Sequence, residues 1–412
     1  MATLPIYEWW RGRIISDVRP PLSQPYVSRL KVVNARRVAS SGSSRIPSRP
    51  DCARGFPPGY NPPIFMQRRL GTIDALRGLA AFSVAWFHFT NGGPLLADGV
   101  LKSSGHYGWV GVEMFFVISG FIIPYSLYRA DYRGGDFSRF LLKRITRLDP
   151  PYIADILLII AISYLVPFAP GFRGEWPHYT ATQLLCHLGY VNSIVGRPWV
   201  NVVFWSLGIE FQYYLLIGVL FPLLVDRRGS VRFGFLFALI LLAILIRRST
   251  LVFVWFPLFV SGILTFQRKA ELISTKTMLG GLLVTGTVCW LVNGHLVSIV
   301  VIATALVIAF VEIPSSRLTD LGLISYSMYL LHVPIGGKIV NLGARWAHTL
   351  PAQLLVLAAA VAGTIGASWV FYRFIELPSQ RLSSSVRYRG RRAQQVSEPA
   401  VLVAAVGQVE SA

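Results

Sequence analysis

Cysteine and charge are both scarce in this chain of 412 residues. Its three cysteines, Cys52, Cys186 and Cys289, lie far apart and form no C-x-x-C pair, which argues against a disulfide framework or a thiolate zinc site. The seven histidines contain no H-x-x-x-H pair, so we expect no metal. Only 14% of the residues are charged, whereas soluble domains average about 25%. This deficit favours lipid rather than water as the solvent.

Acidic residues are particularly few: the chain has 19 Asp and Glu but 39 Lys and Arg, and its net charge is +20. On a soluble protein such an excess would suggest nucleic acid as a partner. In a chain that is 53% hydrophobic, basic loops gathered on one side of a membrane explain it better. We therefore expect a lipid bilayer and no nucleic acid among the partners.

Residues 1–65 lack any long apolar run and the apolar core of a signal peptide. They are rich in Pro, Ser and Arg and hold ten basic against three acidic residues, which predicts a disordered basic extension. Translation from Met66 is an alternative, since a short basic tail would then directly precede the first apolar stretch. The choice of start stays open. We assign 66–382 to a membrane domain and 383–412 to a cytoplasmic basic tail.

Apolar stretches recur from residue 70 onward, and ten of them approach the roughly 20 residues that cross a bilayer as a helix. The sequence therefore predicts an all-α polytopic membrane helix bundle of about ten transmembrane helices. Residues 180–195 are too polar to span and are predicted as a short helix in a loop. The predicted spans are 72–91, 109–128, 150–168, 200–224, 231–247, 249–266, 276–293, 296–313, 319–340 and 352–375.

The distribution of basic residues orients this bundle. With both termini in the cytoplasm, inside segments hold 21 Lys and Arg and outside loops hold seven. The positive-inside rule therefore predicts a multi-pass protein with both termini cytoplasmic. The outside pair Arg247 and Arg248 fits this orientation poorly.

Ionisable residues inside four of the predicted spans are the first functional clue, because each costs several kcal/mol in lipid. They are His88, Glu113, Glu210 and His332. One such residue alone could simply hydrogen-bond a neighbouring helix, but four at similar depth favour a polar cavity. Arg77 precedes His88 by 11 residues, so both project from one helix face about 16 Å apart.

Two further arginines, Arg144 and Arg147, are three residues apart just before the third predicted span. On a helix they lie one above the other, and paired guanidiniums make a good phosphate clamp. The alternative is that they only orient the helix by positive charge. Asp149, two residues later, places a negative charge beside the proposed clamp and weakens it.

Six short motifs in fixed order resemble the acyltransferase-3 family of membrane acyltransferases, over about residues 70–380. The carboxylate Glu113 stands where that family often has Asp. The motifs are Arg77 with His88, GVEMFFVISGF at 111–121, RITRLDPPY at 144–152, WSLGIE at 205–210, SYSMYLLH at 325–332 and IELP at 375–378.

The resemblance implies an integral membrane O-acyltransferase of a bacterial inner membrane. The expected reaction transfers an acyl group, most simply acetyl, from acyl-CoA to a sugar hydroxyl. The acceptor would be a surface polysaccharide, lipopolysaccharide or glycolipid, presented as a carbohydrate or lipid-linked sugar. Some relatives carry an added hydrolase-like domain, and without one the bundle is expected to complete the transfer alone.

Roles for individual residues follow from the same resemblance. His88 is expected to act as general base, because a neutral imidazole with a pKa near about 6.5 suits that task. A carboxylate from Glu113 or Glu210 would orient it, and His332 is a further catalytic candidate. The expected donor-phosphate ligands are Arg77, Arg144 and Arg147, and the expected substrate contacts are Trp205, Tyr326 and Tyr329. A covalent acyl-enzyme at Ser119 or Ser206 is left open.

A transporter or channel is the alternative from another class, since polar residues at mid-depth also mark substrate pathways. The sequence contains no inverted repeat of the kind that transporters often show, and transport gives no reason for an R-x-x-R pair. The identity of the acceptor, the acyl chain length and the oligomeric state stay open.

Overall fold

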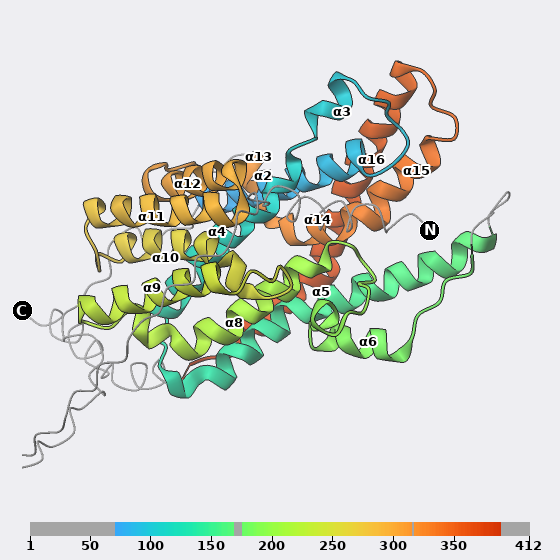
Figure 1. Cartoon of the computed structure of the whole chain (residues 1–412). Coiled ribbons are helices and arrows are strands. Elements are labelled where there is room, and N and C mark those ends of the chain that lie inside the picture. Colours follow the sequence, from blue (N-terminus) through green and yellow to red (C-terminus); the bar gives the residue numbers. More distant parts are fainter. Residues whose placement is uncertain (1–70, 169–174, 315–316, 389–412) are drawn as a thin grey trace, which may run out of the picture.

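The computed structural model of the chain describes residues 71–168, 175–314 and 317–388, and within these ranges every regular element is a helix (Figure 1). The predicted all-α class is therefore confirmed. The predicted extension 1–65, the alternative start at Met66 and most of the tail 383–412 lie outside the described residues.

Helices cover each of the ten predicted spans. The first eight are matched by α2 (Gly71–Asn91), α4 (Gly111–Arg129), α5 (Phe137–Leu165), α8 (Phe204–Leu224), α9 (Gly229–Leu245), α10 (Phe256–Lys269), α11 (Thr275–Asn293) and α12 (His295–Phe310). The ninth is a run of α13 (Arg317–Leu323), α14 (Ser325–Leu331), η6 (His332–Gly337) and α15 (Lys338–Gly343). The tenth joins α16 (Leu350–Phe371), η7 (Tyr372–Glu376) and α17 (Leu377–Ser385).

Five helical runs in the described chain are long and apolar enough to cross a membrane, which supports a multi-pass membrane protein. Two shorter helices, α9 and α12, are apolar as well. A total of ten crossings stays a prediction. The five runs are Val100–Arg129, Gly134–Phe168, Phe204–Leu224, Thr275–Asn293 and Leu350–Ser385.

Helix α4 lies at the centre of the packing, and glycines allow α10 to approach it closely (Figure 1). A Cβ at Gly120 would stand 2.2 Å from the backbone oxygen of Phe259, and one at Gly262 would stand 2.1 Å from that of Val117. Small residues at helix crossings of this kind are typical of membrane bundles. The close contact holds α4 firmly, so the side chains on its other faces have defined positions.

The connections also contain short helices, α3 (Val100–Ser104), α6 (Ala181–Leu188) and α7 (Asn192–Val195). The last two occupy the 180–195 stretch, where the sequence predicted a short helix. Thr180 caps α6 by accepting a hydrogen bond from the Gln183 backbone N–H at 3.1 Å.

Candidate active site

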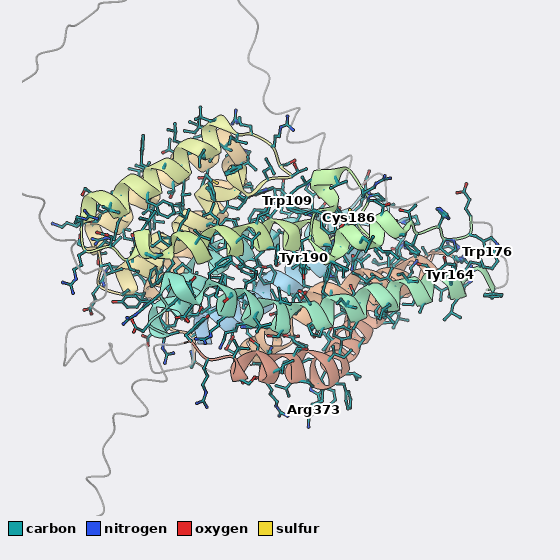
Figure 2. The ribbon with its side chains drawn as sticks, turned by 90° about the horizontal axis from the view of Figure 1, so that it is seen from below. Trp109, Tyr164, Trp176, Cys186, Tyr190 and Arg373 are labelled. Atoms are coloured by element: carbon teal, nitrogen blue, oxygen red, sulfur yellow. The ribbon has the colours of Figure 1, made fainter. Side chains whose placement is uncertain are left out.

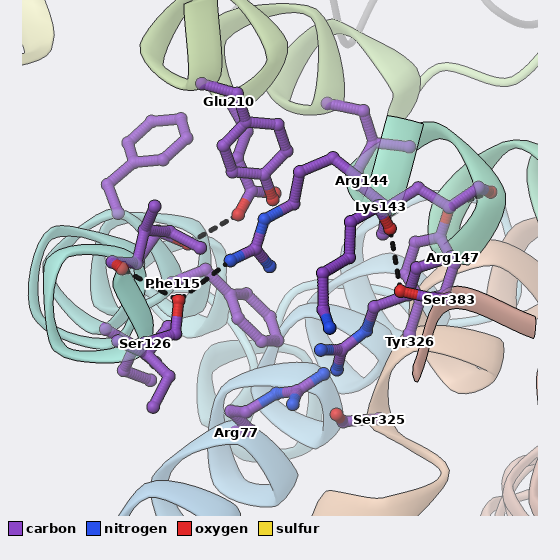
Figure 3. A pocket seen from close by; sticks show the side chains of 18 of the residues that line it. Arg77, Phe115, Ser126, Lys143, Arg144, Arg147, Glu210, Ser325, Tyr326 and Ser383 are labelled. Carbon is purple, nitrogen blue, oxygen red and sulfur yellow. Dashed lines mark hydrogen bonds between the residues drawn. The ribbon is translucent and has the colours of Figure 1, made fainter. Parts of the chain in front are cut away.

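A cavity of about 520 Å³ lies between α2, α4, α5, α8, α14 and the run from η7 to α17 (Figure 3). We call it the central cavity. Its wall follows α4 from Val112 to Arg129, a helical distance of about 26 Å. The cavity is therefore long enough to hold an extended molecule.

Five cations line the central cavity, namely Arg77, Arg129, Lys143, Arg144 and Arg147. Three of the five, Lys143, Arg144 and Arg147, come from the first half of α5. They line the same cavity because positions 143, 144 and 147 lie on one side of that helix. Figure 3 shows the head groups of Arg77, Lys143 and Arg147 pointing toward one another. A concentration of positive charge of this kind suits a ligand with several phosphates.

Arg144 is the buried member of this set and the most closely held. Its Nη2 donates a hydrogen bond to Ser126 Oγ at 3.0 Å, and its guanidinium stands 5.3 Å from the Phe140 ring and 5.5 Å from the Tyr214 ring. Its Nε has no hydrogen-bond partner within the described chain. A buried donor without a partner is costly, and a phosphate oxygen in the cavity would satisfy it.

Tyr388, which follows α17, closes the same part of the wall. The Nζ atom of Lys143 lies 5.8 Å from its ring. Burial raises the pKa of the Tyr388 hydroxyl above its usual range, although nearby Arg144 opposes this. The hydroxyl therefore stays neutral at physiological pH and does not cancel the positive charge.

Glu376 is a cavity residue to which the sequence assigned no role. Its buried carboxylate accepts hydrogen bonds from the Ser327 backbone N–H at 3.2 Å, from Ser327 Oγ at 2.5 Å and from Gln380 Nε2 at 2.9 Å. It also interacts electrostatically with Arg77 and Arg147. The IELP motif at 375–378 could have identified it, but a motif alone does not reveal which charges a carboxylate will meet.

Hydroxyl groups line another part of the cavity. Ser119 Oγ donates a hydrogen bond of 2.5 Å to Glu210 Oε1, and Ser206 Oγ lies 2.6 Å from the Tyr329 hydroxyl. The Tyr329 hydroxyl also donates to the Val203 carbonyl at 3.1 Å. These groups can contact a carbonyl or hydroxyl of a bound substrate.

The arginine and hydroxyl regions are separated along α4. Arg144 bonds Ser126, whereas the Tyr329 ring packs on Phe115 with centroids 5.7 Å apart. Ser126 and Phe115 are 11 residues apart, which is about 16 Å along a helix. A ligand held by phosphates near Arg144 could therefore extend a reactive group to Tyr329.

Two of the predicted catalytic residues meet beyond Tyr329. The rings of His88 and His332 have centroids 5.0 Å apart, and the rings of Tyr329 and His332 have centroids 5.8 Å apart. Neither histidine lines the central cavity. Tyr329 therefore separates the cavity from the histidine pair.

The contacts of His332 indicate which ring nitrogen carries the proton. Its Nδ1 lies 3.2 Å from the Met328 carbonyl oxygen, so Nδ1 is the donor and Nε2 presents a lone pair. The Nε2 atom is buried and has no hydrogen-bond partner in the described part of the chain. It is thus able to accept a proton. His332 begins the π-helix η6, and Glu376 ends the π-helix η7; such segments often occur at functional sites.

The predicted carboxylate partners of His88 lie elsewhere. No hydrogen bond joins Glu113 or Glu210 to either histidine among the described residues. Glu210 bonds Ser119 on the cavity wall, and Glu113 is buried in the first turn of α4, outside the cavity lining. The four mid-depth groups therefore do not form the single cluster expected from the sequence, because they project from different faces of their helices.

The predicted substrate contacts are divided as well. Tyr326 and Tyr329 line the cavity, and the Tyr326 hydroxyl donates to the Leu148 carbonyl at 3.0 Å. Trp205 does not line it, and packs instead on Trp255 with ring centroids 5.5 Å apart. Asp149, which was expected beside the arginine clamp, is also outside the lining and accepts a hydrogen bond from the Tyr190 hydroxyl at 2.9 Å.

The described residues contain no group of three His, Cys, Asp or Glu able to hold a metal ion. The central cavity instead combines cations, hydroxyls and a carboxylate with a nearby histidine pair. This set suits transfer of a group from a phosphate-bearing donor to a hydroxyl.

Comparison with known families assigns the class. A family model described as an acyltransferase domain, Acyl_transf_3, matches residues 70–373. The chain belongs to this family, so the family predicted from the six motifs is confirmed.

Individual relatives support the same class. The chain is 25% identical over 374 residues to the O-acetyltransferase OatA of Staphylococcus aureus (strain NCTC 8325 / PS 47), covering 77% of this chain and 58% of OatA. It is 31% identical over 178 residues to BcsY of Komagataeibacter xylinus, named as a predicted membrane-bound transacylase, covering 40% of this chain and 41% of BcsY. The chain thus spans little more than half of OatA. No solved structure is significantly similar to it.

Proposed function

We propose that the protein transfers an acetyl group from acetyl-CoA to a hydroxyl of a sugar in a surface polysaccharide, lipopolysaccharide or glycolipid. The observation that carries the proposal is that Arg144, at Ser126, and Tyr329, at Phe115, lie about 16 Å apart along α4, with the histidine pair next to Tyr329. A donor with phosphates at one end and a thioester at the other matches this arrangement. The name of OatA, an O-acetyltransferase, supports acetyl as the transferred group.

The donor is held by its phosphates. Arg77, Arg144 and Arg147 contact phosphate oxygens, with Lys143 and Arg129 adding positive charge. Glu376 keeps Arg77 and Arg147 in position by its negative charge. The chain between phosphates and thioester then follows the apolar side chains of α4 that line the cavity.

The transfer step uses the groups around Tyr329. A histidine of the His88 and His332 pair removes the proton from the acceptor hydroxyl. The acceptor oxygen attacks the thioester carbonyl carbon, the carbon–sulfur bond breaks, and the CoA thiolate leaves and is protonated. The Tyr329 hydroxyl, whose own proton is donated to the Val203 carbonyl, can accept a hydrogen bond from the acceptor and hold it beside the thioester. Direct transfer of this kind needs no acyl-enzyme.

The orientation follows from charge. With the termini in the cytoplasm of a bacterium and the protein in its inner membrane, Arg129 and Lys143 face the compartment that supplies acyl-CoA. The histidine pair then lies toward the opposite face, where a lipid-linked sugar can reach it. The acyl group therefore crosses much of the bilayer within the central cavity.

Purified protein in lipid nanodiscs tests the proposal. Binding of radiolabelled acetyl-CoA and of free CoA would be measured, followed by release of CoA in the presence of glycan or glycolipid acceptors. We expect micromolar binding of both molecules and CoA release that depends on the acceptor. Absence of donor binding would refute acyl-CoA as donor, and flux of a solute through reconstituted protein would favour the transporter or channel.

A further inference from the structure

In the connection between α5 and α8, several apolar side chains point outward and several polar side chains point inward. A water-exposed loop shows the opposite arrangement. Within the connection, the apolar side chains of α6 and α7 point outward: Leu185 is 66% exposed, Leu188 63%, Ile194 51% and Val195 54%. The larger polar side chains of the same helices, Gln183, His187 and Asn192, are buried, whereas Thr182 near the start of α6 is exposed. An outward apolar face with a polar interior is expected where lipid, not water, surrounds a segment.

Hydrogen bonds explain how the polar side chains are accommodated inside. Gln183 Nε2 donates to the Pro198 carbonyl at 3.1 Å, and the Val200 backbone N–H donates to His187 Nε2 at 3.1 Å. His187 Nδ1 consequently carries the proton and donates to the Gln183 carbonyl at 2.8 Å. Asn192 Nδ2 also donates to the Pro198 carbonyl, at 3.2 Å. The segment thus satisfies its buried side-chain donors internally, as lipid contact requires, and among the described residues Asn192 Oδ1 is left without a hydrogen-bond partner.

The outward face continues the exposed apolar face of α5. Leu157 and Leu165 on α5 are exposed within a run that is long and apolar enough to cross a membrane. At the end of that run, Tyr164 packs on Tyr179 with ring centroids 6.3 Å apart, and the Tyr179 hydroxyl donates to Ser163 Oγ at 3.0 Å. Figure 2 labels Tyr164 and Trp176 at this end of the molecule, where the Trp176 ring packs on the Phe168 ring with centroids 5.7 Å apart.

The segment then returns along α5 instead of extending away from it. The Tyr190 ring stacks on the Tyr152 ring with centroids 4.7 Å apart, and its hydroxyl bonds Asp149. Tyr152 precedes Leu165 by 13 residues, or about 20 Å of helix. Residues 176–190 therefore lie level with the apolar half of α5, which belongs in the hydrocarbon region.

We infer that residues 176–195 form a re-entrant element embedded in the bilayer, with Leu185, Leu188, Ile194 and Val195 in contact with lipid acyl chains. Arg197, two residues after Val195, is exposed, and its long side chain can reach lipid phosphates. The element shields Tyr152 and Phe204, whose rings are 4.5 Å apart, from lipid. The inference rests on the multi-pass membrane class and not on the proposed donor or acceptor.

Site-directed spin labelling in nanodiscs tests it. Cys52, Cys186 and Cys289 would be replaced by Ala, and one label would be placed by Leu188→Cys or Ile194→Cys. Leu157→Cys on α5 is the lipid reference, and Asp98→Cys in the exposed loop after α2 is the water reference. Collision of the label with oxygen, which concentrates in lipid, would be compared with collision with a water-soluble nickel chelate.

We expect labels at 188 and 194 to match the one at 157, with oxygen collisions several-fold above nickel collisions. Nickel collisions as frequent as at 98 would place the face in water and overturn the inference. Low collision with both reagents would mean that protein covers the face, which would also overturn it. Each labelled variant must first show the gel-filtration profile and helix content of the unlabelled protein.

Discussion

The arginine region of the central cavity and the histidine pair are built in different ways. Five cations with long side chains come from α2, α4 and α5 and line the central cavity. The base candidates are two rings, His88 and His332, packed 5.0 Å apart on two helices. Binding of a multiply charged donor is therefore spread over many groups, whereas proton transfer depends on one contact. Substitutions in the histidine pair should therefore lower turnover strongly, whereas substitutions in the arginine region should weaken acyl-CoA binding by a smaller factor.

The largest loss is expected at the histidines. We predict that His88→Gln and His332→Gln lower turnover by roughly 10²- to 10⁴-fold for whichever histidine is the base, because glutamine cannot accept the proton. The dissociation constant for acyl-CoA should stay unchanged, since the phosphates are held elsewhere. Acetyl transfer and equilibrium binding in nanodiscs measure both quantities.

The exposed His348 supplies the matched control, because His348→Gln leaves the pair intact and should retain turnover. The wild-type rate should also rise with pH, and that dependence should disappear in the variant lacking the base. Near-normal turnover in both single variants would remove the histidine pair from the chemistry, while the acyltransferase class would stand.

A smaller and different loss is expected at the arginines. Arg144→Ala and Arg147→Ala should each weaken acyl-CoA binding by roughly 10- to 100-fold, because a charge-assisted contact contributes about 1.5–3 kcal/mol. Calorimetric titration with CoA measures the change. Arg133→Ala is the control, since Arg133 is exposed and, among the described residues, forms a salt bridge only with Asp131, at 3.3 Å. Equal CoA affinity in all three variants would reduce Arg144 and Arg147 to orientation signals.

Tyr329 joins the two regions, and its hydroxyl should matter less than either. Tyr329→Phe removes the bonds to Ser206 and Val203 but keeps the ring against His332. One such bond contributes about 0.5–1.5 kcal/mol, so turnover should fall roughly 3- to 10-fold with donor affinity retained. Steady-state rates compared with Tyr107→Phe, at an exposed position, test this. A loss above 10³-fold would instead make Tyr329 a catalytic proton donor.

The smallest effect is expected outside both regions. Starting translation at Met66 removes residues 1–65, whose composition predicts no part in the bundle. Membrane insertion and turnover should equal those of the full chain in membranes from the same host. Loss of insertion would show that this segment contributes to the bundle.

Much of the architecture could be predicted from the sequence, because a helix that crosses lipid needs about 20 consecutive apolar residues and such stretches are easily recognised. Each predicted span coincides with a helix, and the 180–195 stretch is helical but short. Arg144 and Arg147 could be placed on one side of α5 because helical spacing alone decides this. The count of crossings was less certain, since helices such as α9 and α12 are shorter than a full span.

Contacts between helices could not be predicted in the same way. Glu210 was expected beside His88 but bonds Ser119, and Asp149 was expected beside the arginines but bonds Tyr190. Trp205 was expected at substrate and packs on Trp255. Each of these side chains lies on a helix where the sequence predicted a span, but the rotation of that helix relative to its neighbours selects its partner.

The sequence by itself determined that lipid surrounds the bundle, that the fold is helical and which family the chain belongs to. It also determined which charged residues lie inside apolar stretches, where only a role explains their cost. These properties depend on composition, on apolar length and on spacing within one helix. Only the tertiary structure decided that Glu376 joins the arginines, that His88 meets His332 behind Tyr329, and that α6 turns its apolar face outward. Such contacts depend on the rotation and crossing of separate helices, which close packing at residues such as Gly120 and Gly262 sets.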